Sequence, residues 1–320
     1  MSSRGYIPDT SHAEHVNLKL LISLIILLLL LYVVLTQLHD FHSSFNIVKH
    51  ASLLWLLVAV AAMGLSYPVS SLTFLFLAKH KISFPRTTLV KLAGSFTNRL
   101  LPAGIGAMGI SYDFLKKNKH STSQSIAVVA ANNTIGLMGH IILLATTLLI
   151  THKSIAELFK FNIKIPSYWI IIISAAVFLI LIVWFKLAGK NFFSNIRQIL
   201  KNLASYQAHP IRLVGALATS ILLTLTSVFC LVACLHAINI HLSFIKVLVV
   251  LTLGIAGGTA VPTPGGLVGA EAGLVAGFVA YGLTSDRALT VTLLYRLLTY
   301  WVALIIGAIA FSIARRLHYI

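Results

Sequence analysis

Long runs of apolar residues without a charged side chain recur along the chain of 320 residues. A helix that crosses the hydrocarbon core of a bilayer needs about 20 consecutive apolar residues. The runs that come close to or exceed this length are 20–38, 51–78, 121–150, 167–185, 213–235 and 297–314. The pattern predicts an all-α, polytopic integral membrane protein with about seven spans.

Two further apolar regions are interrupted. Residues 86–101 are short and basic and end before a proline, and residues 247–263 stop at a Pro-Thr-Pro break. Each break is followed by glycines, a second short stretch and a full-length span. Proline ends an incoming helix, and glycine permits a tight return of the backbone. We therefore expect two broken, re-entrant hairpins, with the hinge residues Pro102, Gly104, Gly106, Pro262, Pro264, Gly265, Gly266 and Gly269.

The two interrupted regions resemble each other, which predicts an internal repeat of residues 85–150 and 246–316. The aligned positions include Pro102 with Pro264, Gly104 with Gly266, and Asn133 with Arg296, with one residue of slippage. The charges of the flanking loops place the first break on a segment that enters from the cytoplasm and the second on one that enters from outside. The repeats would then be inverted, a plan common among transporters. The alternative is two glycine-rich loops at the membrane surface.

The distribution of charge gives an orientation. Bases cluster in residues 79–119 and 186–212 and at the C-terminal end, whereas loops 39–50 and 236–246 hold one lysine each. Because basic loops stay in the cytoplasm, both termini are expected on the cytoplasmic side of the membrane. We expect this membrane to be the cell membrane of a bacterium.

The composition also narrows the partners. The chain is 58% hydrophobic and 10% charged, with a net charge of +17. Its bases lie between spans, where they contact anionic lipid headgroups, so we expect membrane lipids and no nucleic acid as partners. Residues 1–17 are interpreted as a cytoplasmic tail and residues 18–320 as a single transmembrane domain.

Two charged residues near the second break are candidates for chemistry. Glu271 lies seven residues after Pro264, about two turns into a returning helix, and Arg296 lies about 15 Å deep in a span that starts near Asp286. Intramembrane charges are costly, normally face an interior and mark a functional site. We expect Arg296 to meet a lipid headgroup, with Glu271 as its resting partner or as a proton-coupled switch. The alternative is a purely structural Glu–Arg pin.

The first repeat lacks this pair, because Gly109 and Asn133 occupy the matching positions. Arg99, close to the first break, and Asn133 complete the predicted headgroup site, and Asn98 and Asn132 are further polar candidates nearby. Arg99 could instead reach the cytoplasmic headgroups with its long side chain.

The remaining polar residues do not indicate catalysis. His140 is interpreted as a hydrogen-bonded packing residue, and Cys230 and Cys234 as packing residues one helical turn apart. The loop histidines lack metal-ligand spacing, and the sequence contains no Walker-type phosphate loop. We expect no catalytic residue, no metal and no cofactor.

Two stretches resemble a known family. They are "NRLLPAGIGAMG" with the following "DFLKKNKHSTSQSIAVV", and "PTPGGLVGAEAGLVAGFVAYGLTSDRALTVTLLYRLLTYW". Both are similar to the membrane region of lysylphosphatidylglycerol synthases, the multiple peptide resistance factors, which also occurs alone in flippase-like proteins. The resemblance covers nearly the whole chain, although the first stretch lacks charges that relatives often carry.

The resemblance implies movement of a modified lipid to the outer leaflet. Full-length synthases add a soluble domain that transfers lysine or alanine to phosphatidylglycerol, and this chain has no room for it. The leading hypothesis is a lipid translocase for an anionic or aminoacylated phospholipid or a lipid-linked intermediate. The alternatives are a membrane subunit that works with a separate soluble synthase or glycosyltransferase, and a scaffold. A homo-oligomer is left open.

Overall fold

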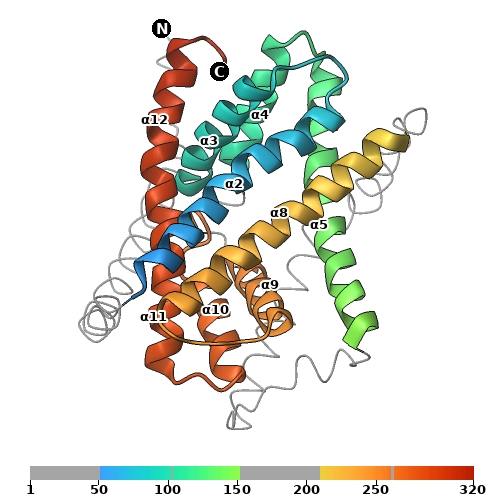
Figure 1. Cartoon of the computed structure of the whole chain (residues 1–320). Coiled ribbons are helices and arrows are strands. Elements are labelled where there is room, and N and C mark those ends of the chain that lie inside the picture. Colours follow the sequence, from blue (N-terminus) through green and yellow to red (C-terminus); the bar gives the residue numbers. More distant parts are fainter. Residues whose placement is uncertain (1–50, 102–103, 152–209, 261–262) are drawn as a thin grey trace, which may run out of the picture. The chain divides into compact units, whose positions relative to one another are not determined.

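The described part of the chain is built from helices joined by short loops. The computed structural model describes residues 51–101, 104–151, 210–260 and 263–320, and these contain helices and no β-strand (Figure 1). The helices are α2 (Leu53–Leu77), α3 (Phe84–Leu100), α4 (Ile105–Lys117), α5 (Thr122–Thr151), α8 (Pro210–Ala237), α9 (Phe244–Ala260), α10 (Gly269–Ala280), α11 (Ser285–Arg296), the π-helix η1 (Leu297–Val302) and α12 (Ala303–Arg316). The predicted all-α class is confirmed.

In the described part of the chain, four stretches of helix are long and apolar enough to cross a membrane: Leu53–Leu77, Thr122–Thr147, Pro210–Ala237 and Ser285–Arg316. They account for four predicted spans, and the other two predicted spans and the N-terminal tail lie outside the described residues. The last stretch starts 12 residues before the predicted apolar run at 297, because α11 continues through η1 into α12.

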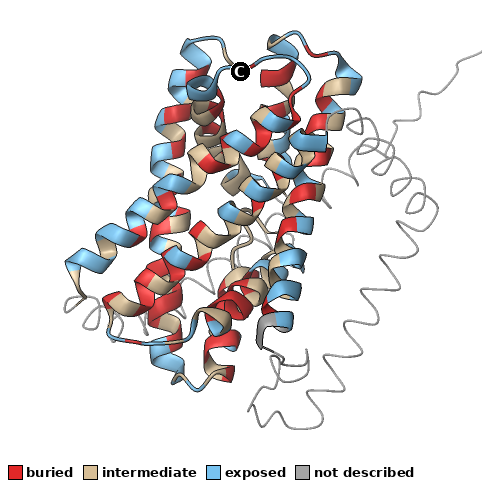
Figure 2. Cartoon of the chain, turned by 45° about the vertical axis from the view of Figure 1, so that its right-hand side comes forward, coloured by how far each residue is buried: buried red, intermediate tan, exposed pale blue. Residues whose placement is uncertain are grey.

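The outward faces of these stretches are apolar. Leu53, Leu149 and Ile211 are among the large apolar side chains that are exposed. Figure 2 shows exposed positions recurring along the long helices. Such surfaces are unfavourable in water and natural in hydrocarbon, where lipid tails cover them.

Small residues bring the helices close together. A Cβ added at Gly215 of α8 would lie 2.6 Å from the Phe76 ring of α2. On α12, a Cβ at Gly307 would lie 2.7 Å from the Ser95 hydroxyl of α3. Close approach at small residues replaces the hydrophobic effect as the source of helix–helix contact in lipid.

Both predicted hairpins are present, and they have the same order of elements. In the first, α3 of 17 residues is followed by a break, α4 of 13 residues and α5 of 30 residues. In the second, α9 of 17 residues is followed by a break, α10 of 12 residues and a helical stretch of 32 residues. In Figure 1 the pair α3–α4 and the pair α9–α10 lie in opposite halves of the view. An inverted repeat stays a prediction.

Candidate functional site

The second break is a glycine turn that delays the start of α10. Gly265 and Gly266 have φ values of +61° and +67°, which glycine adopts without a steric penalty. Val268, the residue before α10, has φ +71°, a conformation costly for a β-branched side chain and most often found at functional sites. Pro264 begins this turn, and Pro262 lies outside the described residues.

This geometry corrects one prediction. The sequence placed Glu271 about two turns into the returning helix. The helix begins at Gly269, so Glu271 lies in its first turn. The reason is that the positive φ values of the preceding turn cannot continue an α-helix.

The first break also has a glycine with positive φ before the returning helix, but here it is a single residue. Gly104 has φ +77° and is the residue before α4. A Cβ at Gly106 would overlap the backbone carbonyl of Thr97 on α3, so only glycine allows the two helices to pack this closely. Pro102 lies outside the described residues.

Glu271 and Arg296 form the predicted ion pair. The Nε of Arg296 donates to Oε1 of Glu271 at 2.6 Å, and Nη2 donates to the carbonyl oxygen of Gly265 at 3.3 Å. The two side chains are only 13% and 11% exposed, so solvent screens the pair weakly. The second carboxylate oxygen, Oε2, is buried and has no hydrogen-bond partner in the described structure.

Arg99 lies beside this pair and turns inward. Its Nη1 donates to the carbonyl oxygen of Ser95, and its Nη2 donates to that of Thr299 in the last span. The centre of the Tyr300 ring lies 4.8 Å from Cζ of Arg296 and 5.8 Å from Cζ of Arg99, so this ring is close to both guanidinium groups. The alternative in which Arg99 reaches outward to the headgroups is therefore wrong.

The charges at this point do not balance. Among the described residues, Arg296 pairs with a carboxylate and Arg99 does not, and the carbonyl groups that Arg99 contacts accept hydrogen bonds without neutralising its charge. A buried charge without a counter-charge is unfavourable, so the site has a physical preference for an additional anion.

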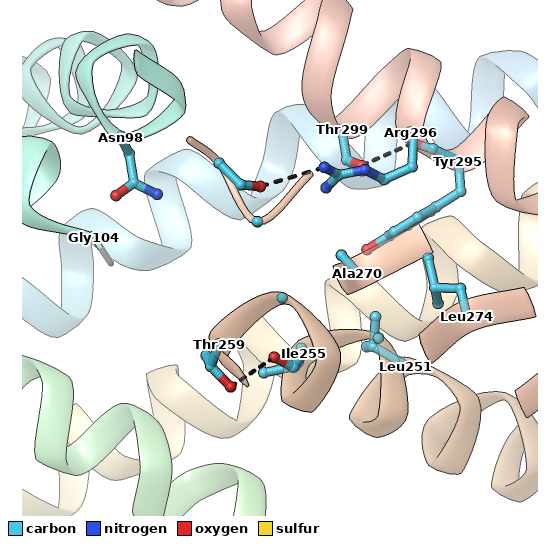
Figure 3. Close-up of a pocket in the computed structure, with 14 residues that line it drawn as sticks. Asn98, Gly104, Leu251, Ile255, Thr259, Ala270, Leu274, Tyr295, Arg296 and Thr299 are labelled. Atoms are coloured by element: carbon cyan, nitrogen blue, oxygen red, sulfur yellow. Dashed lines mark hydrogen bonds between the residues drawn. The ribbon is translucent and has the colours of Figure 1, made fainter. Parts of the chain in front are cut away.

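A cavity of about 610 Å³ opens where the two breaks meet. Its wall includes Asn98 and Gly104 from the first hairpin, and Gly265, Arg296 and Thr299 from the second hairpin and the last span. Figure 3 shows Asn98 and Gly104 on one side of the space and Arg296 on the other, with Arg296 hydrogen-bonded to the turn of the second break.

Glu271 does not line this cavity, and its carboxylate accepts a hydrogen bond from Nε of Arg296. It therefore orients the cation and does not meet a guest in the cavity directly.

Asn133 lies elsewhere. Its side chain is exposed and lines a neighbouring cavity of about 270 Å³, which shares Asn98 and Gly104 with the larger one. The aligned positions Asn133 and Arg296 thus do not line the same cavity.

Thr299 and Tyr300 were not predicted from the sequence, whereas Asn98 was a polar candidate near the first break. Asn98 lines both cavities, and its buried Oδ1 has no hydrogen-bond partner among the described residues. Thr299 and Tyr300 lie in the π-helix η1, whose wide turn directs the Thr299 carbonyl to Arg99. The proximity of Asn98 to the Leu101-Pro102 break made it a candidate, whereas no sequence pattern marks a π-helix.

The other polar residues act in packing. The Nε2 of His140 lies 2.9 Å from the Thr252 hydroxyl and so links α5 to α9. Cys230 and Cys234 are buried free thiols. Among the described residues, no group of three metal-ligating side chains comes together.

Comparison with known proteins places the chain. A search among curated proteins found no match. A model of the family described as the lysylphosphatidylglycerol synthase TM region matches residues 18–307, which include both breaks, Glu271 and Arg296. The chain therefore belongs to the family of lysylphosphatidylglycerol synthase transmembrane regions and is a membrane protein.

Proposed function

We propose that the protein is a flippase-like translocase, which carries the headgroup of an anionic or aminoacylated phospholipid, or of a lipid-linked intermediate, past the two breaks. The observation that carries this proposal is the cavity of about 610 Å³, bounded by both breaks, with the Arg296 guanidinium in its wall. Irregular backbone at membrane depth is tolerated where it is buried in protein or lines a wet cavity.

The chemistry of the site suits a phosphate. Arginine offers several N–H donors in a plane that matches phosphate oxygens. Glu271 occupies Nε of Arg296, and the bond from Nη2 to Gly265 is long at 3.3 Å. A headgroup phosphate can replace the Gly265 carbonyl on Nη2 without breaking the bond to Glu271.

The excess positive charge can aid transfer. Moving a bare phosphate into a low-dielectric region is unfavourable, and a cation in the cavity wall offsets part of this cost. Because one carboxylate of the described residues balances only one of these two guanidinium groups, a monoanionic headgroup would neutralise the other. In the proposed orientation both termini are cytoplasmic, and the breaks give access from opposite sides of the membrane.

The family description favours a second candidate, a membrane subunit that acts with a separate soluble synthase or glycosyltransferase. In this case the cavity would hold the lipid for a partner enzyme. Lipid binding would then be seen with the chain alone, but movement between leaflets would not.

The test uses the full chain in proteoliposomes with a fluorescent anionic phospholipid. We expect the wild type to accelerate exchange between leaflets and Arg296→Ala to abolish the acceleration. Arg316→Ala is the matched control, because this arginine is exposed at the end of α12. Mass spectrometry of co-purified lipids should show one anionic class lost only in Arg296→Ala. Equal exchange by wild type and a folded Arg296→Ala would overturn the translocase proposal, and lost stability with unchanged lipids would identify Glu271–Arg296 as a structural pin.

A further inference from the structure

Two histidines lie together at the turn between α8 and α9. His236 is in the last turn of α8, and His241 precedes the start of α9. The centres of their rings are 4.8 Å apart, with an angle of 78° between the ring planes. On a continuous α-helix, side chains five positions apart would point about 140° away from each other. Here α8 ends at Ala237 and Asn239 has φ +57°, so the chain turns back and brings the two rings together.

The free nitrogens of this histidine pair are suited to a ligand. Nδ1 of His236 donates to the Val232 carbonyl oxygen at 2.9 Å, so in the neutral ring Nε2 keeps a free lone pair. Metal-binding histidines are commonly oriented in this way, by a carbonyl or carboxylate on the ring nitrogen that does not bind the metal. His241 is exposed, and its ring nitrogens have no hydrogen-bond partner among the described residues.

The spacing of the two rings fits coordination of one ion. With metal–nitrogen bonds of about 2.0–2.1 Å and an angle of about 90–109° at the metal, two imidazole rings have centres about 4.5–5.2 Å apart. The observed 4.8 Å lies within this range. The Trp55 ring of α2 packs against His236 with its centre 4.6 Å away, which restricts the positions open to the His236 ring.

A second histidine pair shows that spacing alone does not make such a site. The rings of His80 and His120 are also 4.8 Å apart, at 79°. Nε2 of His120 accepts from the His80 backbone N–H at 3.2 Å, and Nδ1 lies 3.0 Å from the Asn118 carbonyl oxygen. Both nitrogens of His120 are therefore engaged with the backbone, whereas His236 has one nitrogen to offer.

The pair at the turn is open to ions from the aqueous phase. It lies at the end of α8, one of the stretches long enough to cross the membrane, where the chain would emerge from the hydrocarbon. Tryptophan is enriched at this boundary, and Trp55 is 36% exposed. An ion could therefore reach the rings without crossing lipid.

We propose that His236 and His241 bind one divalent transition-metal ion, Cu²⁺ more tightly than Zn²⁺, with water at the remaining positions. Imidazole nitrogen suits these metals, and Cu²⁺ binds most tightly in the first-row series. Mg²⁺ and Ca²⁺ require oxygen ligands, so this donor set excludes them. The ion would link the end of α8 to the start of α9, the incoming helix of the second hairpin. Neither histidine lines the cavity of Arg296, so the site does not depend on the proposed translocation.

The experiment titrates Cu²⁺ into the full chain, purified in detergent without an oligohistidine tag, and follows binding by electron paramagnetic resonance. We expect a Cu²⁺ signal with imidazole nitrogen coupling that His236→Asn and His241→Asn each weaken about 10-fold or more in affinity. His236→Asn retains a donor near the position of Nδ1 and lacks Nε2, so it removes the ligand while keeping the bond to Val232. The matched control is His80→Asn, which alters the second pair and should leave this signal unchanged.

Each other outcome overturns the site. Equal Cu²⁺ affinity in wild type and a folded His236→Asn would refute it. An effect of His236→Asn without one of His241→Asn would refute joint coordination, and an equal effect of His80→Asn would show non-specific binding to imidazole. Since His241 is exposed, His241→Asn tests the site even where His236→Asn does not fold. Arg296→Ala should bind Cu²⁺ as the wild type does, so failure of the translocase proposal and failure of the metal site are seen separately.

Discussion

The two broken hairpins, α3–α4 and α9–α10, have closely similar lengths and different contents. The first holds bases along both helices, among them Lys91 and Arg99, and its acid Asp113 is half-exposed and paired with Lys117. The second is almost wholly apolar and contains one buried acid, Glu271. The difference shows that glycine turns and close packing determine the path of the backbone. Hairpins with the same backbone path can carry different charged residues.

Each hairpin also holds its cation differently. Arg99 of the first is held by the carbonyl groups of Ser95 and Thr299, which leave its charge in place. Arg296, beside the second, is neutralised by Glu271. The positive charge of Arg99 beside the first hairpin is thus not neutralised by these contacts. At the second hairpin, an anion would meet the ion pair of Arg296 and Glu271.

The largest expected effect comes from removing the charge of Glu271. Glu271→Gln leaves Arg296 buried without its counter-charge, which should cost about 3–5 kcal/mol of stability. Thermal unfolding of the purified protein in detergent measures this cost. The matched control is Asp113→Asn, which breaks the half-exposed pair with Lys117 and should cost about 0.5 kcal/mol or less. Equal losses in the two variants would show that the second hairpin does not depend on its ion pair.

A smaller effect is expected from the packing of the first hairpin. Gly106→Ala places a Cβ against the Thr97 carbonyl and should cost about 1–3 kcal/mol or more. Gly109→Ala on the same helix is the control, because nothing lies within 4 Å of a Cβ there. We expect this control to be neutral or slightly stabilising. A melting temperature of Gly106→Ala equal to that of Gly109→Ala would refute the close approach of α3 and α4.

The smallest effect distinguishes the hairpins by pH. His120, in the turn after α4, accepts a hydrogen bond at Nε2 from the His80 backbone N–H at 3.2 Å and lies 3.0 Å from the Asn118 carbonyl at Nδ1. Burial, with a smaller contribution from His80, lowers the pKa of His120 below its usual 6.5. The turn after α10, residues 281–284, holds no histidine.

The unfolded chain therefore binds a proton at His120 more readily than the folded chain does. Stability from this residue is complete above a pH of about 6.5 and is lost as the pH falls below it. Melting curves between pH 7.5 and 5 should show a fall that is reduced in His120→Gln and unchanged in His318→Asn, which alters an exposed histidine. If the melting temperatures of wild type and His120→Gln changed identically with pH, His120 would not make the stability of the first hairpin depend on pH.

The sequence predicts the path of the backbone better than the contacts of the site. Apolar runs and Pro-Gly breaks act through local physics, so the four described spans and both hairpins could be placed from the sequence. The pairing of Glu271 with Arg296 was also accessible, because two rare buried charges have reason to meet. Asn98 was a candidate because it lies near the first break, but the inward turn of Arg99 depends on which helices face each other, which the order of residues does not reveal.

The π-helix in the last span has a consequence for register. A π-turn takes in one more residue than an α-turn, so α12 is rotated by about 100° relative to an uninterrupted helix. This rotation lets α11 direct Arg296 to the second break while α12 places Gly307 and Ala310 against α3. One inserted residue therefore lets one continuous helical stretch contact both the second break and α3, which a regular α-helix in the same position could not do. Deleting this residue would keep α11 and α12 helical but would rotate the contact face of α12 away from α3 when Arg296 faces the second break.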